Sequence, residues 1–401
     1  MIIMFLQAII NKNPQLLDAA VALHRQNKIP AGSYVLDLDT VRFNAARIVK
    51  EAKACGLKVF AMTKQVSRNP ALIKVLQEEG VDGCVCVDMD DARAVFASGM
   101  RIAHLGHLVQ VPKAEVAAAL AMKPMYWTVY SLDKAREISA AVPQGQTQNI
   151  LLRIFDEGDT FYKGHEGGFC LEELDYVIEQ INSMPGLRFA GFTSFPTQLF
   201  NHETNTVEHT KNYYTLLNTA KHYEGKLGCK LEINAPGTTS CHLFKEMAEA
   251  GVTQVEPGHG LTGTCPQHAR LELPERPAVI YVSEVSHRYK GCDYCYGGGM
   301  YIDPVFDAYD VKACVGKTGE EARSRLISCD MPKPESIDYY GILQTPANVN
   351  VQTGDTVIFG FRIQGFVTRA YVVPIEGIHS GNPTVKGIFN SEGREVGWPT
   401  W

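Results

Sequence analysis

The chain has 401 residues, of which 45% are hydrophobic and 20% are charged, a balance typical of a globular protein with two or three domains. Its net charge of −6 excludes a broad basic surface for nucleic acid. The apolar start, Met1–Ile10, is too short to span a membrane and lacks the charge pattern of a signal peptide, so we expect an amphipathic helix running to about Gln26. The eleven scattered cysteines predict reduced thiols in the cytoplasm.

Strand-like and helix-like segments alternate from residue 33 to 265. The predicted strands are 34–38, 57–64, 81–87, 102–105, 126–130, 150–155, 189–194, 230–234 and 253–256. Helix starts are indicated at Asp39 or Thr40 and at Asn69-Pro70, and helix ends at Gly56 and Gly80. This regular alternation predicts parallel βαβ units and an α/β fold of the (β/α)8 TIM-barrel type. Such a barrel takes eight strands, so one of the nine must belong elsewhere.

The pattern changes at residue 266. Segments 271–285 and 356–374 are extended and separated by Gly- and Pro-rich turns, and only 319–326 suggests a helical turn. We therefore expect three parts: an N-terminal helix over residues 1–32, the barrel over 33–265, and a second, mostly β domain over 266–401.

A single amine ends the apolar strand that begins at Leu57. Functional residues of barrels lie at the C-terminal ends of strands, which is where Lys64 stands. Apolar neighbours such as Phe60 and Met62 would desolvate this amine and lower its pKa, and an unprotonated amine can form an imine. Lys64 therefore suits a pyridoxal 5′-phosphate (PLP) Schiff base. The alternative is a surface lysine just past a strand.

Two glycine-rich turns, 234–240 and 256–263, could hold the phosphate of such a cofactor. Phosphate sites recur after strands 7 and 8 of this fold, and glycine lets backbone N–H groups approach an anion. Hydroxyl donors before a helix start add to the first turn. The candidate cofactor-binding residues are Asn234, Gly237, Thr238, Thr239, Gly258, His259 and Gly260, with Ser240 beside them. The alternative is that the turns only close the barrel.

These pieces resemble the alanine racemase-like, fold type III family of PLP proteins and, more narrowly, its YhfX-type branch. The matching segments are 59–64, 234–240 and 255–260, and the resemblance spans roughly residues 33–265. It implies that Lys64 ends the first barrel strand, that 34–38 joins the second domain, and that 253–256 is strand eight. It also implies a head-to-tail homodimer in which each second domain completes the partner's site.

Glu256 departs from the racemase pattern, which has arginine opposite the pyridine nitrogen. A carboxylate there would hold a protonated ring, which is a stronger electron sink. The resemblance further implies that Arg153 is a cofactor- or substrate-orienting cation, although a salt bridge in the barrel mouth is the alternative. Ser194 and Phe195 stand where the family commonly has a ring-stacking histidine, and His165 is an ordinary loop histidine or an acid–base group.

Racemisation needs two bases on opposite faces of a carbanion, and in the family the second base comes from the partner subunit. The segment 287–301 offers four candidates, and we favour Cys292 as the second catalytic residue beside Lys64. The other candidates are Tyr294, Cys295 and Tyr296. Cys292, Cys295 and His287 also resemble half of a zinc site, but the chain lacks a second matching pair, so we expect no metal.

The leading hypothesis from the sequence is a PLP-dependent enzyme acting on a free amino acid, with racemisation or epimerisation first. Decarboxylation or elimination comes next, because of Glu256. A non-catalytic PLP carrier is an alternative of another class, and a PLP-free metal enzyme is a third. The expected partners are the amino-acid substrate and a second copy of the chain, with neither nucleic acid nor membrane.

Overall fold

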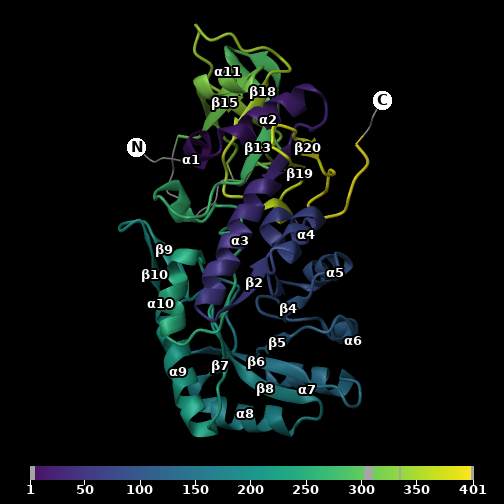
Figure 1. Cartoon of the computed structure of the whole chain (residues 1–401), viewed down its shortest axis with the longest axis vertical. Coiled ribbons are helices and arrows are strands. Elements are labelled where there is room, and N and C mark those ends of the chain that lie inside the picture. The colour runs from purple at the N-terminus through teal and green to yellow at the C-terminus, as the bar shows by residue number, and fades with distance from the viewer. Residues whose placement is uncertain (1–4, 302–309, 334–335, 399–401) are drawn as a thin grey trace. The chain divides into compact units, whose positions relative to one another are not determined.

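The computed structural model describes residues 5–301, 310–333 and 336–398 (Figure 1). The chain forms two compact units. One contains residues 46–64 and 76–258, and the other contains residues 1–45, 65–75 and 259–401. The first is called here the barrel unit and the second the sheet unit.

The barrel unit is built on eight parallel strands that close on themselves, as the sequence predicts. In hydrogen-bonding order they run β5-β4-β3-β2-β12-β11-β8-β6, and pairing of β5 with β6 closes the ring. The strands are β2 (Lys58–Met62), β3 (Gly83–Cys86), β4 (Ile102–Leu105), β5 (Tyr126–Val129), β6 (Gln148–Phe155), β8 (Leu187–Thr193), β11 (Glu232–Asn234) and β12 (Gln254–Val255). The short β7 (Phe169–Cys170) extends the edge of β6, and β9 (Gln198–Asn201) forms a hairpin with β10 (Thr206–His209).

Helices cover the outside of these strands (Figure 1). They are α5 (Met89–Ala97), α6 (Val116–Ala121), α7 (Leu132–Ala141), α8 (Leu174–Ser183), α9 (Lys211–Leu227) and α10 (Phe244–Glu249). Side-chain caps fix where two of them begin: Asp88 accepts from the backbone of Asp91 at α5, and Ser131 accepts from that of Lys134 at α7. Among the described residues, the helices are too short or too polar to cross a membrane.

The N-terminal end of the barrel, called here the floor, is closed by a polar network around Glu232. This carboxylate pairs with Lys58 and accepts hydrogen bonds from Tyr126 (2.7 Å), Thr253 (2.8 Å) and Gln254 (2.8 Å). Burial alone would raise the pKa of Glu232, but the bonds from Lys58 and its neighbours outweigh burial and lower it. Both carboxylate oxygens of Glu232 are therefore satisfied.

The sheet unit contains a nine-stranded, mostly antiparallel sheet in the order β14-β17-β16-β15-β18-β13-β1-β19-β20. Its strands are β1 (Ser33–Asp37), β13 (Val279–Tyr289), β14 (Cys292–Tyr296), β15 (Lys312–Gly316), β16 (Leu326–Asp330), β17 (Tyr340–Leu343), β18 (Thr356–Phe359), β19 (Tyr371–Glu376) and β20 (Thr384–Val385). Strand β1 runs antiparallel to β13 and parallel to β19, so the ninth predicted strand lies in this sheet. Because β14 also pairs with β13, the strands from β13 to β18 form a closed ring.

The expected single N-terminal helix is wrong, because two helices are present, α1 (Phe5–Lys12) and α2 (Pro14–Arg25). The break falls at Asn13, whose side chain accepts from the backbone of Leu16 while Pro14 supplies a residue without an N–H. Apolar faces of both helices pack into one core with β1, β13 and β19. The segment is thus part of the sheet unit and its core.

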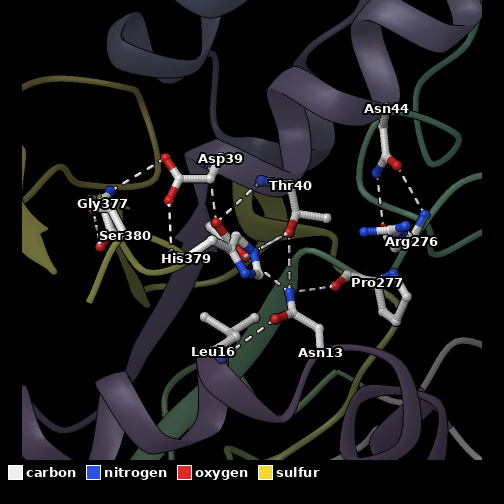
Figure 2. A network of polar contacts seen from close by, with 11 residues as sticks. Asn13, Leu16, Asp39, Thr40, Asn44, Arg276, Pro277, Gly377, His379 and Ser380 are labelled. Carbon is white, nitrogen blue, oxygen red and sulfur yellow. Dashed lines mark hydrogen bonds and ion pairs between the residues drawn. The ribbon is translucent and has the colours of Figure 1, made fainter. Parts of the chain in front are cut away.

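Asp37, not Asp39 or Thr40, begins α3 (Leu38–Ala54). The Asp37 carboxylate is fully buried and accepts from the backbone N–H groups of Asp39 and Thr40, as an N-cap does. Asn13 and His379 also contact this carboxylate, so residues far apart in sequence meet at one helix start (Figure 2). By contrast, Asn69 caps α4 (Pro70–Glu78) as the sequence predicts. The remaining helix is α11 (Gly319–Ser324).

Candidate functional site

Lys64 lies directly after the C-terminal end of β2 and begins a short 3-10 turn, Lys64–Val66. Its side chain is half-buried, and its charge helps to lower the pKa values of His107 and His165, so both rings lie within its electrostatic reach. The backbone N–H of Met62 donates to the carbonyl of Pro257 at 2.9 Å. The lysine therefore follows a strand whose end adjoins the turn that carries Glu256.

Glu256 is buried just after β12, and only one of its two carboxylate oxygens accepts hydrogen bonds from the described residues. Its Oε1 accepts from the ring Nδ1 of His104 at 2.7 Å and from the amide of Asn234 at 2.9 Å. Its Oε2 is buried and has no hydrogen-bond partner among the described residues. The hydrogen bonds from His104 and Asn234 favour the ionised carboxylate and, with His107 nearby, hold the pKa of Glu256 below its ordinary value despite burial.

His107 lies beyond the end of β4, with its Nε2 at 3.6 Å from Glu256 Oε2. Burial lowers the pKa of His107 to about 3, and the charges of His104, Arg153 and Lys64 act in the same direction against the attraction of Glu256. The ring is therefore neutral at pH 7. Its Nδ1 is buried without a partner among the residues that the structure describes.

His104, His107 and Glu256 could also hold a metal ion, since their donor atoms lie within 4.8 Å of one another. The 2.7 Å contact between His104 and Glu256 is a hydrogen bond, however, and Asn234 already donates to the same oxygen. A metal that used both groups would have to displace that proton. The arrangement present is a hydrogen-bonded cluster with one open carboxylate oxygen.

Arg153, at the end of β6, is fully buried and bound within the barrel unit. Its guanidinium donates to Tyr130 Oη (2.5 Å) and to the carbonyls of His165 (2.7 Å), Phe195 (3.3 Å) and His107 (3.4 Å). These bonds use both Nη atoms, which a bidentate carboxylate clamp would need. The geometry favours a residue that fixes the loops of the barrel mouth, and direct cofactor contact by Arg153 stays a prediction.

Aromatic rings surround the position after β8. The ring of Phe195 lies 5.5 Å from that of His107 and 6.1 Å from that of His165, measured between centroids. Ser194, in contrast, is buried, and its hydroxyl accepts from Asn212 at 3.4 Å. The structure thus places Phe195, more than Ser194, against the rings of His107 and His165.

The first glycine turn, 234–240, begins with a residue that contacts Glu256. Asn234 accepts from Thr193 at 2.7 Å and donates to the carboxylate, so its side chain orients Glu256. A Cβ on Gly237 would come within 2.5 Å of the side chain of Gln198, so only glycine fits there. Thr238 is bound through its backbone to Gln198, and the helical segments that follow are short. Phosphate binding by this turn stays a prediction.

The second glycine turn is divided between the two units. Gly258 is the last residue of the barrel unit, whereas His259 and Gly260 belong to the sheet unit. Within the sheet unit, His259 is buried, and its Nδ1 lies 3.0 Å from the hydroxyl of Thr264. The predicted role of these residues in phosphate binding is untested by this geometry.

Cys292 begins β14 in the sheet unit, half-buried, and its thiol contacts the amide oxygen of Gln344 at 3.4 Å. Tyr294 stacks on His287, with ring centroids 4.6 Å apart. Cys295 is fully buried, and Tyr296 is exposed. Side chains of β14 alternate between the two faces of the strand, so Cys292, Tyr294 and Tyr296 share one face and Cys295 lies on the other. Cys292 stays the predicted second base.

The sequence interpretation missed the two histidines that contact Glu256. His104 falls inside a strand that was correctly predicted at 102–105, and His107 follows it by three residues. A strand that places one histidine in the barrel and ends near a second was a usable signal, because strand ends converge at the barrel mouth. Their partner, Glu256, is 152 residues from His104 and could not be identified by spacing.

Comparison with known proteins identifies the family of the chain. Residues 36–266 match the family described as alanine racemase, N-terminal domain, and residues 280–385 match the YhfX-like C-terminal domain. The uncharacterized protein YhfX of Escherichia coli K12 is 39% identical over 396 residues, covering 98% of this chain and 100% of that protein.

Solved structures with the same fold include proteins named as an aldolase, a dehydratase and a racemase. D-threonine aldolase from Filomicrobium marinum has a TM-score of 0.68 at 16% identity, covering 91% of this chain and 95% of its own. A D-threo-3-hydroxyaspartate dehydratase variant has a TM-score of 0.65 at 16% identity, covering 91% and 97%. Alanine racemase of Clostridium difficile 630, in complex with cycloserine, has a TM-score of 0.61 at 16% identity, covering 90% and 98%. The family match covers more than half of the chain, which therefore belongs to the alanine racemase-like, fold type III family of PLP-dependent proteins.

Proposed function

We propose that this protein is a PLP-dependent enzyme that acts on a free amino acid, with racemisation or epimerisation as its reaction. The observation that carries the proposal is the pairing of two groups in one barrel mouth. Lys64 follows the end of β2, and the open oxygen of Glu256 lies in the turn that adjoins this strand end. A cofactor with an aldehyde at one position and a basic ring nitrogen at another needs these two groups.

The residues present fit this cofactor. A buried carboxylate oxygen without a partner costs free energy unless a donor reaches it, and a protonated pyridine nitrogen is such a donor. The neighbouring ring nitrogen of His107 is also unsatisfied among the described residues. The His107 ring lies within the electrostatic reach of Lys64, in a unit whose fold places its functional groups at this end.

When bound, the cofactor supplies an electron sink that acidifies the Cα–H bond of an attached amino acid. Lys64 would hold the cofactor and would accept or return a proton on one face of the substrate. Glu256 would hold the ring nitrogen protonated, because its carboxylate has an oxygen without a hydrogen-bond partner among the described residues. Arg153 and Phe195 would fix the loops around the ring. Gly237, Thr238, Thr239, Gly258, His259 and Gly260 are our candidates for the phosphate.

A second candidate reaction is decarboxylation or elimination, and the ionised Glu256 favours it. A protonated ring stabilises a carbanion for longer than a neutral ring does, which allows bonds other than Cα–H to break. Structural relatives whose titles name an aldolase and a dehydratase have this fold. The proposal for the second base is Cys292 supplied by a partner subunit in a homodimer, with no metal required.

The test begins with the purified protein and added PLP. We expect a visible absorption band that is retained on desalting, and borohydride reduction should attach the cofactor mass to the peptide containing Lys64. A screen of D- and L-amino acids for change of chirality, ammonia and CO₂ then distinguishes isomerase from lyase. Cofactor binding without turnover of any amino acid would favour a PLP carrier, and absence of binding would refute the proposal.

A further inference from the structure

His104 is the residue that links Glu256 to the body of the barrel. Its ring is fully buried on β4 and lies between two partners, with Nδ1 at 2.7 Å from Glu256 Oε1 and Nε2 at 2.6 Å from the hydroxyl of Thr128 on β5. Three barrel strands therefore contribute to one chain of hydrogen bonds. This chain lies wholly within the barrel unit.

The chemistry of Glu256 fixes the direction of one of these bonds. A carboxylate can only accept, so Nδ1 of His104 must carry the proton that it shares with Glu256. The hydroxyl of Thr128 can donate to Nε2 or accept from it, so both ring nitrogens have a partner. The Nδ1 donor therefore points at one carboxylate oxygen.

The two oxygens of Glu256 are therefore unequal. Oε1 receives two donors, from His104 and Asn234, whereas Oε2 receives none among the described residues. Two donors on one oxygen fix the rotation of the carboxylate plane and favour its ionised form. The orientation of Oε2 is thereby fixed before any ligand binds.

We propose that His104 is a positioning residue that fixes Glu256 in one orientation and ionised, so that Oε2 is presented to the ring nitrogen of the cofactor. The inference rests on the proposed function and adds to it the group that controls the ring nitrogen. His104 touches neither substrate nor cofactor in this scheme and acts only through Glu256. Thr128 contributes to the same orientation by holding the other ring nitrogen of His104.

Two amide substitutions separate the bonds of His104. The amide nitrogen of asparagine reaches about as far as Nδ1, and that of glutamine about as far as Nε2. His104→Asn keeps a donor for Glu256, whereas His104→Gln keeps a partner for Thr128 and loses that donor. The probe is pyridoxamine 5′-phosphate labelled with ¹⁵N in the ring, because this molecule has no aldehyde and cannot bond to Lys64.

In the wild-type protein we expect the ¹⁵N resonance of a protonated ring. His104→Asn should keep that resonance with nearly the same affinity, and His104→Gln should shift it toward the unprotonated ring and bind the probe at least about tenfold more weakly. Equal resonances and equal affinities in all three proteins would overturn the role of His104 and leave the proposed function intact. A wild-type protein that binds neither this probe nor PLP would overturn both.

A measurement without cofactor covers the case in which a variant binds nothing. The infrared band of a protonated carboxyl group, assigned by its loss in Glu256→Gln, reports the ionisation of Glu256 directly. At neutral pH we expect this band in His104→Gln but not in the wild type or in His104→Asn. Its absence from folded His104→Gln, verified by circular dichroism, would contradict the proposal even if probe binding changed.

Discussion

Each end of the barrel contains one glutamate, Glu232 on β11 at the floor and Glu256 after β12 at the mouth. The two carboxylates differ in how many of their oxygens have hydrogen-bond partners. On the floor, Glu232 has an ion pair with Lys58 and three further donors, which satisfy both of its oxygens. At the mouth, Glu256 is more deeply buried, yet one of its oxygens has no partner among the described residues. A protein selected only for stability would satisfy the more buried group first.

The difference separates a structural network from a functional one. A complete network gains stability from every bond, whereas an incomplete buried one leaves an atom unsatisfied and loses stability. The same contrast appears in the lysines of β2, since Lys58 is paired at the start of this strand and Lys64 follows its end. Four pairs of variants test whether the contrast is real.

The largest effect should come from the two lysines of the β2 segment. Lys64→Ala should abolish covalent cofactor attachment and all turnover, because no other amine takes its place. Lys58→Ala should keep the visible absorption band and lose about 1 kcal/mol of stability, since its ion pair is partly exposed. Absorbance and urea unfolding measure both results. An unchanged band in Lys64→Ala would refute the assignment of the lysine.

The next effect separates the two glutamates. Glu256→Gln should weaken cofactor binding at least about tenfold and leave stability nearly unchanged, because it removes a desolvated charge as well as a bond. Glu232→Gln should do the reverse: cofactor affinity should be unchanged and the protein should lose about 1 kcal/mol of stability, a small loss because the ion pair is partly exposed to solvent. Cofactor titration and urea unfolding give the two numbers. Identical behaviour of the two variants would remove the distinction between mouth and floor.

The backbone of the mouth should be less tolerant than that of an outer helix. Gly237→Ala places a Cβ within 2.8 Å of three atoms of Gln198 and should cost about 1–3 kcal/mol together with cofactor affinity. Gly225→Ala, on α9, meets nothing within 4 Å and should stabilise the protein by about 0.4–1 kcal/mol. Thermal unfolding with and without PLP compares them. A harmless Gly237→Ala would argue against a tight phosphate turn.

The smallest effect is a dependence of stability on pH that arises at the mouth. The pKa of His107 is about 3 in the folded chain, whereas a solvated histidine of the unfolded chain has the ordinary pKa of 6.5. Below pH 6.5 the unfolded chain binds a proton that the folded chain does not, so His107 lowers stability by up to about 1.4 kcal/mol per pH unit towards pH 3. His107→Phe should flatten this slope, measured by urea unfolding at about pH 6.5 and about pH 5.5. The exposed His222→Gln is the control, and equal slopes in all three proteins would contradict the buried, neutral ring.

Much of the barrel could be predicted because its signals are local. The strands at 58–62 and 102–105 are short apolar runs, and Asn69 precedes Pro70 in an unambiguous helix start. The first helix start failed because Asp37 lies within an apolar strand, where its role depends on burial. The prediction of a single N-terminal helix failed because the polar pair Asn13-Pro14, an N-cap followed by an N1 proline, starts a second helix.

The candidate site was only half predictable. Lys64 ends an apolar strand, so a role for its amine could be proposed from its neighbours in sequence. The role of Glu256 was implied by the family resemblance, and both roles stay predictions. The roles of His104 and Asn234 depend on closure of the ring of strands, which brings them to the same carboxylate oxygen from distant segments. Arg153 shows what a residue type at a strand end leaves open: its guanidinium is bound to loop carbonyls, and its contact with the cofactor stays a prediction.

Strand β1 determines when the two units can be completed. Its residue Leu36 pairs with Pro374 in parallel register, so one of its neighbours is synthesised about 340 residues later. The barrel strands all lie between residues 58 and 255, and the ribosome delivers them as one consecutive set. Because closing long loops slows assembly and domains fold as units, we expect the barrel to form first on the nascent chain. The first 45 residues can then complete their sheet only after the last strands emerge.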